Sequence, residues 1–163
     1  LREHGAEVDV INAGVSGDTS AGGAARVGWT LTPEVDAMIV ALGGNDLLRG
    51  IDPDVTRANL EKILIAARDA EVQVLLIGMQ APGNFGPEYK QAFEANYSEL
   101  AAGYGTLFLP SFVAPLDDGS GDPAAMRPLL QGDGIHPNAE GVRRIVAGIG
   151  PKVLDLIARA QAE

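Results

Sequence analysis

Short apolar runs alternate with longer amphipathic segments along this chain, and this alternation limits the possible folds more than any other feature. The apolar runs that have the length of strands are residues 8–12, 37–42, 72–77 and 106–109. Segments with helical spacing of apolar residues follow at about 20–31, 52–70, 87–102 and 138–160. Strands that alternate with helices of this length predict a parallel sheet with helices on both faces. We therefore expect one α/β domain over residues 1–163, built as a three-layer, doubly wound parallel sheet.

Local signals set further expectations for single elements. The run 37–42 is wholly apolar and ends in two glycines, which is typical of a strand buried on both faces. Pro151 lies in the apolar stripe of the last helix, where it should kink or interrupt the helix. Residues 1–5 have the pattern of a helix end, and a short helix is expected near 122–130.

Composition excludes several classes of function. Hydrophobic residues make up 46% of the 163 residues and charged residues 21%, which is enough apolar material for a core. The 12 Lys and Arg against 22 Asp and Glu give a net charge of −10, which argues against binding to nucleic acid or to anionic membrane surfaces. The chain has no cysteine, which excludes disulfides, thiolate catalysis and Cys-based metal sites. No apolar run approaches the roughly 18 residues needed to span a bilayer.

Three polar segments are placed where a sheet of this kind binds ligands. Segments 12–20 and 42–46 follow predicted strands, and segment 133–137 lies in the last long loop. Ligands of doubly wound sheets bind beyond the carboxyl ends of the strands, where such loops gather. The three segments are therefore expected to meet at one edge of the sheet.

Asp133 and His136 are three residues apart across a turn that contains a glycine. A carboxylate at this spacing can accept the Nδ1 proton of the histidine, which leaves Nε2 free as a general base. The alternative is an ordinary loop histidine beside a turn-forming aspartate. These two residues taken alone do not decide between the two interpretations.

Asn45 and Gly17 are candidate donors to a developing oxyanion. Asn45 follows two glycines at a strand end, where its side-chain amide can point over the sheet edge. Gly17 offers an unhindered backbone N–H in the first polar segment. Each could instead be a turn residue, which is the commoner role. Asp18 and Asp46 are interpreted as caps or turn anchors rather than as catalysts.

In their order and at strand ends, the three segments resemble three sequence blocks of the SGNH (GDSL) hydrolase family. Ser-Gly17-Asp-Thr resembles block II, Gly-Gly-Asn45-Asp resembles block III, and Asp133-Gly-Ile-His136 resembles block V. The likeness is strongest to the branch of bacterial arylesterases, acyl-CoA thioesterase I and lysophospholipase L1. It covers essentially the whole chain.

The resemblance implies a flavodoxin-like fold with a hydrolytic site. Carried over residue by residue, it makes His136 the base, Asp133 its orienting acid, and Gly17 and Asn45 the oxyanion donors. It implies no metal and no cofactor. It also implies a small-molecule ester as the substrate and a periplasmic or secreted location.

The resemblance also assigns residues that contact the substrate. Gly44 is expected to line the substrate site. Residues 79–86 match the family's mobile substrate-side loop, which places Pro82 and Phe85 near the acyl or leaving group. Phe85 could equally be an exposed loop aromatic.

The sequence departs from the family at the nucleophile. The family's serine stands in a Gly-Asp-Ser block at the end of the first strand, and no Gly-Asp-Ser occurs in this chain. In the family that strand lies between those that correspond to 8–12 and 37–42, so its loss would leave two rows of buried unpaired backbone groups, at about 1–3 kcal/mol for each group. We therefore expect the folded protein to contain a serine-bearing strand upstream of Leu1. The alternative is a pseudo-enzyme.

The leading prediction is a serine hydrolase that cleaves carboxylic esters through an acyl-enzyme. The net charge of −10 disfavours highly anionic substrates such as coenzyme A thioesters, so uncharged short-chain or aryl esters rank above thioesters and lysophospholipids. A domain of the same layout that binds a small ligand without turnover is the alternative. The missing serine favours it, but the Asp133–His136 pair has no role in it. Metal-dependent hydrolysis by His136, Asp46 and Asp133 has little support, because the chain has only two histidines.

Overall fold

Among the residues that the structure describes, the sheet has three parallel strands. The structure, a computed structural model, describes residues 1, 5–120 and 122–162. Its strands are β1 (Ala37–Val40), β2 (Gln73–Ile77) and β3 (Leu107–Leu109). β1 pairs with β2, and β2 pairs with β3, so β2 is the central strand of the three.

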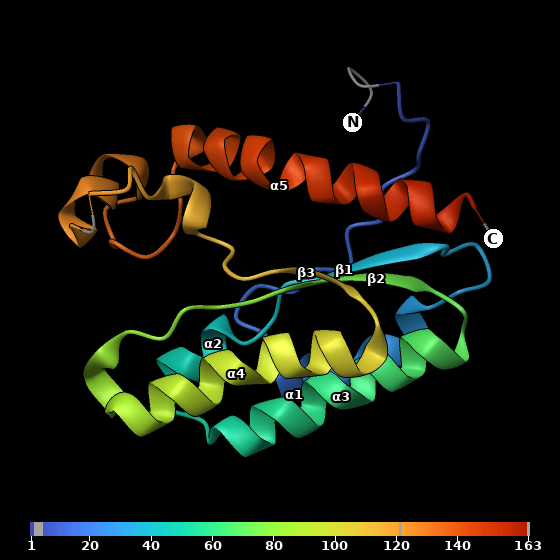
Figure 1. Ribbon diagram of the computed structural model, residues 1–163, viewed down its shortest axis with the longest axis horizontal. Coiled ribbons are helices and arrows are strands. Elements are labelled where there is room, and N and C mark those ends of the chain that lie inside the picture. The colour runs from blue at the N-terminus through green and yellow to red at the C-terminus, as the bar shows by residue number, and fades with distance from the viewer. Residues whose placement is uncertain (2–4, 121, 163) are drawn as a thin grey trace.

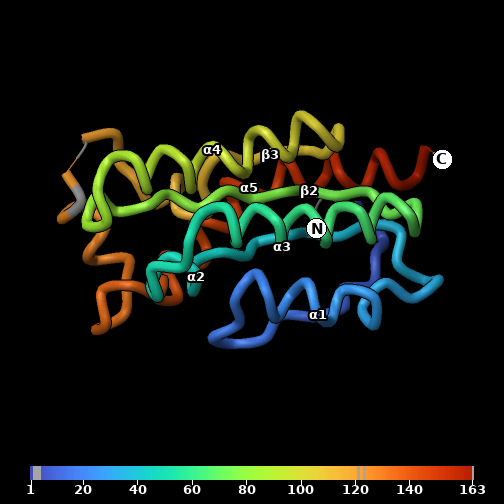
Figure 2. The backbone as a smooth tube through the Cα atoms, turned by 90° about the horizontal axis from the view of Figure 1, so that it is seen from below, coloured from blue at the N-terminus to red at the C-terminus, as the bar shows by residue number. Residues whose placement is uncertain are grey.

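Helices cover both faces of this sheet. Three of them, α1 (Ser20–Thr30), α3 (Pro53–Asp69) and α4 (Pro87–Tyr104), lie on one face, and α5 (Ala139–Ala160) lies on the other (Figure 1). α3 packs between α1 and α4, as Figure 2 shows from below. The predicted three-layer, doubly wound α/β arrangement is therefore confirmed, and each of these helices begins and ends within two residues of its predicted bounds.

The helix starts are fixed by the side chains that precede them. Asp52 caps α3 by accepting a hydrogen bond of 2.9 Å from the N–H of Asp54. Asn138 caps α5 in the same manner. Pro151 lies inside α5, which continues through it; of the two predicted effects, a kink or an interruption, the interruption is wrong. Buried Ile145 and Val153 on either side of the proline keep both halves of the helix packed, which offsets the one lost backbone hydrogen bond.

Short helices fill the connections between the main elements. The short helix expected near 122–130 is present as a 3-10 helix, η4 (Pro123–Leu129). Three others were not expected from the sequence: α2 (Gly44–Leu48), η2 (Gly83–Phe85) and η3 (Ala114–Leu116). Each has five residues or fewer, which is too short to show a helical period.

The central strand β2 has apolar side chains on both faces. Val74 and Leu76 pack into the larger core with α3 and α4, around residues such as Leu60, Ile63, Phe93 and Tyr97. Leu75 and Ile77 pack into a second core with α5, around Val153 and Leu156. This alternation follows from the two-residue period of a strand.

β1 is covered less completely, so the expected burial of the run 37–42 on both faces is wrong. Val40 is buried in the larger core, but Ile39, which points to the opposite face, is 44% exposed. The difference arises because α5 packs mainly over the central strand β2 and covers β1 less.

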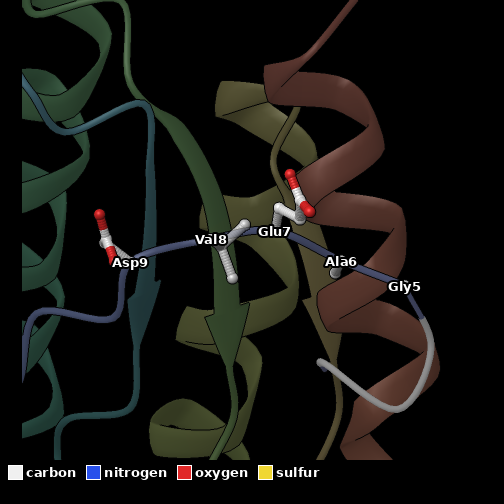
Figure 3. Close-up of a pocket in the computed structure, with 5 residues that line it drawn as sticks. All are labelled: Gly5, Ala6, Glu7, Val8 and Asp9. Atoms are coloured by element: carbon white, nitrogen blue, oxygen red, sulfur yellow. The ribbon is translucent and has the colours of Figure 1, made fainter.

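The predicted strand at 8–12 is wrong. These residues form no ladder with any described strand, and Val10 and Ile11 are 77% and 65% exposed. Figure 3 shows Gly5 to Asp9 running crosswise to the neighbouring strands rather than alongside them. An apolar run becomes a strand only when another strand offers it hydrogen-bond partners, and β1 is paired with β2 alone among the described strands. The helix end expected at 1–5 falls largely on residues 2–4, which lie outside the described residues.

Candidate active site

The predicted site residues form two groups at the carboxyl end of the sheet. One group comes from the loop before α1 and from α2, and it contains Gly17, Gly44 and Asn45. The other comes from the loop before α5, and it contains Asp133 and His136. α2 and the start of α5 both lie toward the left in Figures 1 and 2. In the first group, Asn45 donates to the carbonyl of Asp18, the residue after Gly17. In the second group, Asp133 is bonded to His136. No hydrogen bond among the described residues joins one group to the other.

The pocket drawn in Figure 3 is separate from both groups. It is lined by Gly5, Ala6, Glu7, Val8 and Asp9, none of which is a predicted site residue.

The Asp133 carboxylate makes three hydrogen bonds within the turn, two of them with His136. Its Oδ2 lies 2.7 Å from the ring Nδ1 of His136, and its Oδ1 accepts the backbone N–H groups of Ile135 and His136 at 2.9 and 3.0 Å. These hydrogen bonds, the His136 side chain first, lower the pKa of Asp133 to about 2. The carboxylate is therefore ionised at neutral pH and can hold the ring with Nε2 directed away from it. The His136 side chain is 67% exposed, so that nitrogen is accessible to a reactant.

The loop that carries this pair is closed by local hydrogen bonds. The His136 carbonyl accepts the Gln131 N–H at 2.7 Å, and Leu130 forms a single antiparallel bridge with Pro137. The Asn138 amide donates to the carbonyls of Pro128 and Leu130, at 2.8 and 3.2 Å. Asn138 thus caps α5 and closes the loop at the same time, which fixes His136 one turn before the helix.

Asn45 is positioned by the sharp turn between β1 and α2. Gly43 makes this turn with φ of 111°, and a Cβ at that position would lie 1.9 Å from the Tyr97 hydroxyl, so no other residue fits. The Tyr97 hydroxyl donates to the Leu42 carbonyl at 2.8 Å. The half-buried Asn45 then donates one amide proton to the Asp18 carbonyl at 2.9 Å. Its second amide proton remains for another acceptor.

Gly17 lies in an exposed turn that Asn45 and its neighbours contact. The turn is closed by a hydrogen bond of 3.2 Å from the Asp18 N–H to the Val15 carbonyl, and Gly17 has φ of 76°. The Gly17 carbonyl accepts from the Arg49 guanidinium at 3.0 Å. No described residue accepts a hydrogen bond from the Gly17 N–H.

Asp18 and Asp46 act as anchors, as interpreted from the sequence. The Asp18 carboxylate accepts the Thr19 N–H at 3.1 Å and forms an ion pair of 2.8 Å with Arg26. The Asp46 carboxylate is fully buried and bonded to Ser20 and Thr56. The Asp46 carboxylate is therefore used in hydrogen bonds of the interior. Among the described residues, no group of carboxylates and histidines is arranged to hold a metal ion.

The loop 79–86, which is predicted to lie on the substrate side, is held at two places. The Ala81 N–H donates to Glu94 of α4 at 2.9 Å, and Lys90, paired with Glu94, donates to the Ala81 carbonyl at 2.8 Å. Farther along the loop, Phe85 is 43% exposed and lies 5.0 Å from the ring of Tyr89.

The part of this loop near Phe85 reaches the end of α2. A Cβ at Gly50 would lie 3.0 Å from the Phe85 ring, so the ring packs against that backbone. Pro82 is exposed on the same loop. Phe85 is thus close to the segment that carries Asn45, whereas no described contact joins Phe85 or Pro82 to His136.

The sequence did not single out the residues that join α2 to the segment before α1, in the group that contains Gly17 and Asn45. Arg49, Thr56 and Ser20 are not among the predicted site residues. One usable signal existed: Arg49 is four residues after Asn45, so in a helix the two side chains lie on one face.

A doubly wound sheet with a carboxylate-oriented histidine at its carboxyl end is typical of α/β hydrolases. Comparison with known proteins narrows this class. The profile of the GDSL-like lipase/acylhydrolase family matches residues 1–144, and the chain belongs to this family.

Relatives of known name agree with this assignment. The chain is 39% identical over 158 residues to a Pseudomonas aeruginosa protein named esterase TesA; the match covers 96% of this chain and 75% of that protein. It is 37% identical over 136 residues to the Escherichia coli thioesterase 1/protease 1/lysophospholipase L1, covering 82% of this chain and 62% of the relative. A crystal structure of TesA superposes with a TM-score of 0.83 at 37% identity, covering 96% of this chain and 83% of the other.

Proposed function

We propose that this chain forms the acid–base and oxyanion side of a serine hydrolase that cleaves carboxylic esters through an acyl-enzyme. The observation that carries the proposal is the Asp133–His136 pair, with 2.7 Å between carboxylate and Nδ1 and an exposed ring. A histidine held in this way can take a proton at Nε2 and return it, which both halves of an acyl transfer require.

The proposed reaction has two steps. In the first, a serine hydroxyl attacks the ester carbonyl, His136 takes its proton, and the negative oxygen accepts hydrogen bonds from the Gly17 N–H and the second Asn45 amide proton. The intermediate collapses, and His136 passes the proton to the leaving alcohol. In the second step, water attacks the acyl-enzyme, with His136 again as base, and the carboxylic acid is released.

We propose further that the serine is carried by a strand that pairs with the free edge of β1. Ile39 of β1 and the apolar residues Val10 and Ile11 have exposed side chains, as expected for surfaces that a further element covers. Two serines of the described residues are unsuited to the role: Ser20 is buried and bonded to Asp46, and Ser111 is buried at 4% exposure. The serine-bearing strand is the element that the family resemblance implies.

The proposed substrate is a small ester with an apolar or aryl group. Leu48, which is 59% exposed at the end of α2, and Phe85 offer apolar surface beside Asn45. A Cβ at Gly44 would meet no atom within 4 Å, so the backbone there faces open space that a substrate can enter. The names of the relatives include ester and thioester hydrolases. The net charge of −10 disfavours polyanionic substrates among these classes.

The test is covalent labelling of the natural protein that carries this chain, followed by peptide mapping. A fluorophosphonate probe should label one serine outside residues 1–163, and p-nitrophenyl acetate should be hydrolysed. His136→Ala should abolish both reactions. Label on Ser16, or on any serine of this chain, would contradict the strand proposal. Absence of labelling and of turnover in a protein that still binds small esters would replace the hydrolase by a ligand-binding domain.

A further inference from the structure

We infer that α2 is a positioning element for the oxyanion donors, and that Asp46 and Arg49 are its positioning residues. This inference rests on the proposed function and extends it to residues that touch no substrate. Side chains of α2 and of Arg49, which follows it, hold three consecutive peptide groups of the segment 17–20. We call this arrangement the α2 clamp. Its contacts are Arg49 to the Gly17 carbonyl, Asn45 to the Asp18 carbonyl, and Asp46 to the Ser20 N–H.

The innermost contact of the α2 clamp is a buried carboxylate with three hydrogen bonds. Asp46, which has no solvent exposure, accepts the Ser20 N–H at 2.8 Å, the Ser20 hydroxyl, and the Thr56 hydroxyl at 3.2 Å. The Asn59 amide donates to the Ser20 hydroxyl at 3.1 Å and completes the network. A buried carboxylate persists only where such bonds replace its hydration, so this network fixes the start of α1 against α2.

The outermost contact of the α2 clamp is made by an exposed side chain. Arg49 reaches back from the end of α2 and donates to the Gly17 carbonyl at 3.0 Å. A long cationic side chain at an exposed position gains little stability from one hydrogen bond. The contact therefore matters less for folding than for where the Gly17 peptide lies.

The two proposed donors need this alignment because they come from different segments. Gly17 precedes α1, whereas Asn45 belongs to α2, and the two must point at one oxygen before the reaction begins. The Asn45 side chain is oriented by the hydrogen bond that it donates to the Asp18 carbonyl. Asp46 and Arg49 then set the position of the segment on either side of that carbonyl. Without them, the distance between the Gly17 N–H and the Asn45 amide is free to vary.

The experiment compares Arg49→Met with Arg68→Met in the natural protein. Arg68 is a matched control, because it is 63% exposed, is paired with Asp69, and lies at the far end of α3. Arg49→Met should lower kcat about tenfold with KM changed less than about twofold, since a misplaced donor weakens the transition state more than the ground state. The rate of labelling by the fluorophosphonate should fall by the same factor. Arg49→Lys, which can still donate to the Gly17 carbonyl, should recover part of the rate.

A second variant tests the buried part of the α2 clamp. Asp46→Asn risks unfolding, so Thr56→Val is used, which removes one of the three hydrogen bonds to Asp46 and keeps the side-chain shape. It should lower kcat about threefold or more, again with KM unchanged. The melting temperatures of all variants are measured in parallel.

The outcomes separate the inference from the proposed function. If the wild-type protein is active, His136→Ala is inactive and Arg49→Met keeps full kcat, the α2 clamp has no positioning role although the hydrolase stands. The inference is also wrong if Arg49→Met and Arg68→Met lower kcat by the same factor. It is equally wrong if the loss of kcat in Arg49→Met is accompanied by a lower melting temperature. If the wild-type protein neither turns over esters nor reacts with the probe, the proposed function fails first.

Discussion

The two sides of the proposed active site are held together in opposite ways. On the oxyanion side, the contacts of Asn45, Asp46 and Arg49 with the segment 17–20 reach 26 to 32 residues along the chain. On the acid–base side, every hydrogen bond to the Asp133 carboxylate comes from the next three residues. Asp46 is fully buried, whereas the side chain of His136 is 67% exposed.

This difference fits what each side would have to do in the proposed acyl transfer. Oxyanion donors act by being fixed beforehand, because any reorganisation during the reaction costs part of the stabilisation. A general base must reach first the serine and then the leaving group or water, so it needs a defined tautomer but an open ring. Long-range burial suits the first task, and a short local turn suits the second.

The largest effect is expected on the local side of the comparison. His136→Ala should lower kcat by about 10⁴-fold, because in the proposed mechanism His136 takes the serine proton. The melting temperature should stay unchanged, since the side chain is mostly exposed and its bonds are local. Ester hydrolysis and thermal unfolding are measured on the same sample. Near-full activity would remove His136 from the mechanism, and a large loss of stability would break the contrast between the two sides.

A smaller loss of activity, accompanied by a loss of stability, is expected on the long-range side. Asn45→Ala should lower kcat by about 10²–10³-fold, as removal of one oxyanion donor does. It should also lower the free energy of unfolding by about 1 kcal/mol, because the Asp18 carbonyl loses its donor. Denaturant unfolding and steady-state kinetics give the two numbers. A drop in kcat of less than about threefold would return Asn45 to the role of a turn residue.

The same contrast explains how far the sequence could predict this molecule. The helices α3 and α5 carry long apolar stripes and their own caps, so their bounds follow from local residues alone. The Asp133–His136 spacing is equally local, and the structure makes the contact with Nδ1 that this spacing allows, although the spacing alone did not decide between an oriented pair and an ordinary loop histidine. The helix bounds and the Asp133–His136 contact both depend on residues that are close in sequence. They could therefore be inferred without knowledge of the tertiary structure.

Features that depend on residues far apart in the sequence could not be predicted from local patterns. α2 is too short to show a period, and the Asp46 network joins residues from three separate helices. The run 8–12 has the composition of a strand, but its state depends on whether another strand lies beside it. Composition describes what a segment can pair with and leaves open whether the partner is there.

An effect of a few fold is expected at Phe85, which lies near the segment that carries Asn45. Phe85→Ala should raise KM for phenyl esters about fivefold relative to methyl esters, since part of an apolar contact is lost. Trp29→Ala is the matched control, because Trp29 is an aromatic residue that is 88% exposed on α1. Equal KM ratios for wild type and Phe85→Ala would make Phe85 a loop aromatic that packs only on its neighbours.

The smallest effect is expected from acid, on the carboxylate that orients the base. The pKa of Asp133 is lowered from 3.8 to about 2, first by the His136 side chain and then by the N–H groups of Ile135 and His136. A lowered pKa stabilises the folded turn above pH 3.8 and loses that effect only as the pH falls through about 2. The carboxyl carbon resonance of Asp133 should therefore stay unchanged from neutral pH to about pH 3. In His136→Ala the midpoint should rise toward 3.8 without reaching it, because the two backbone N–H donors remain. A wild-type midpoint near 3.8 would mean that the pair does not form in solution, and the acid–base side would then lack the one local contact that defines it.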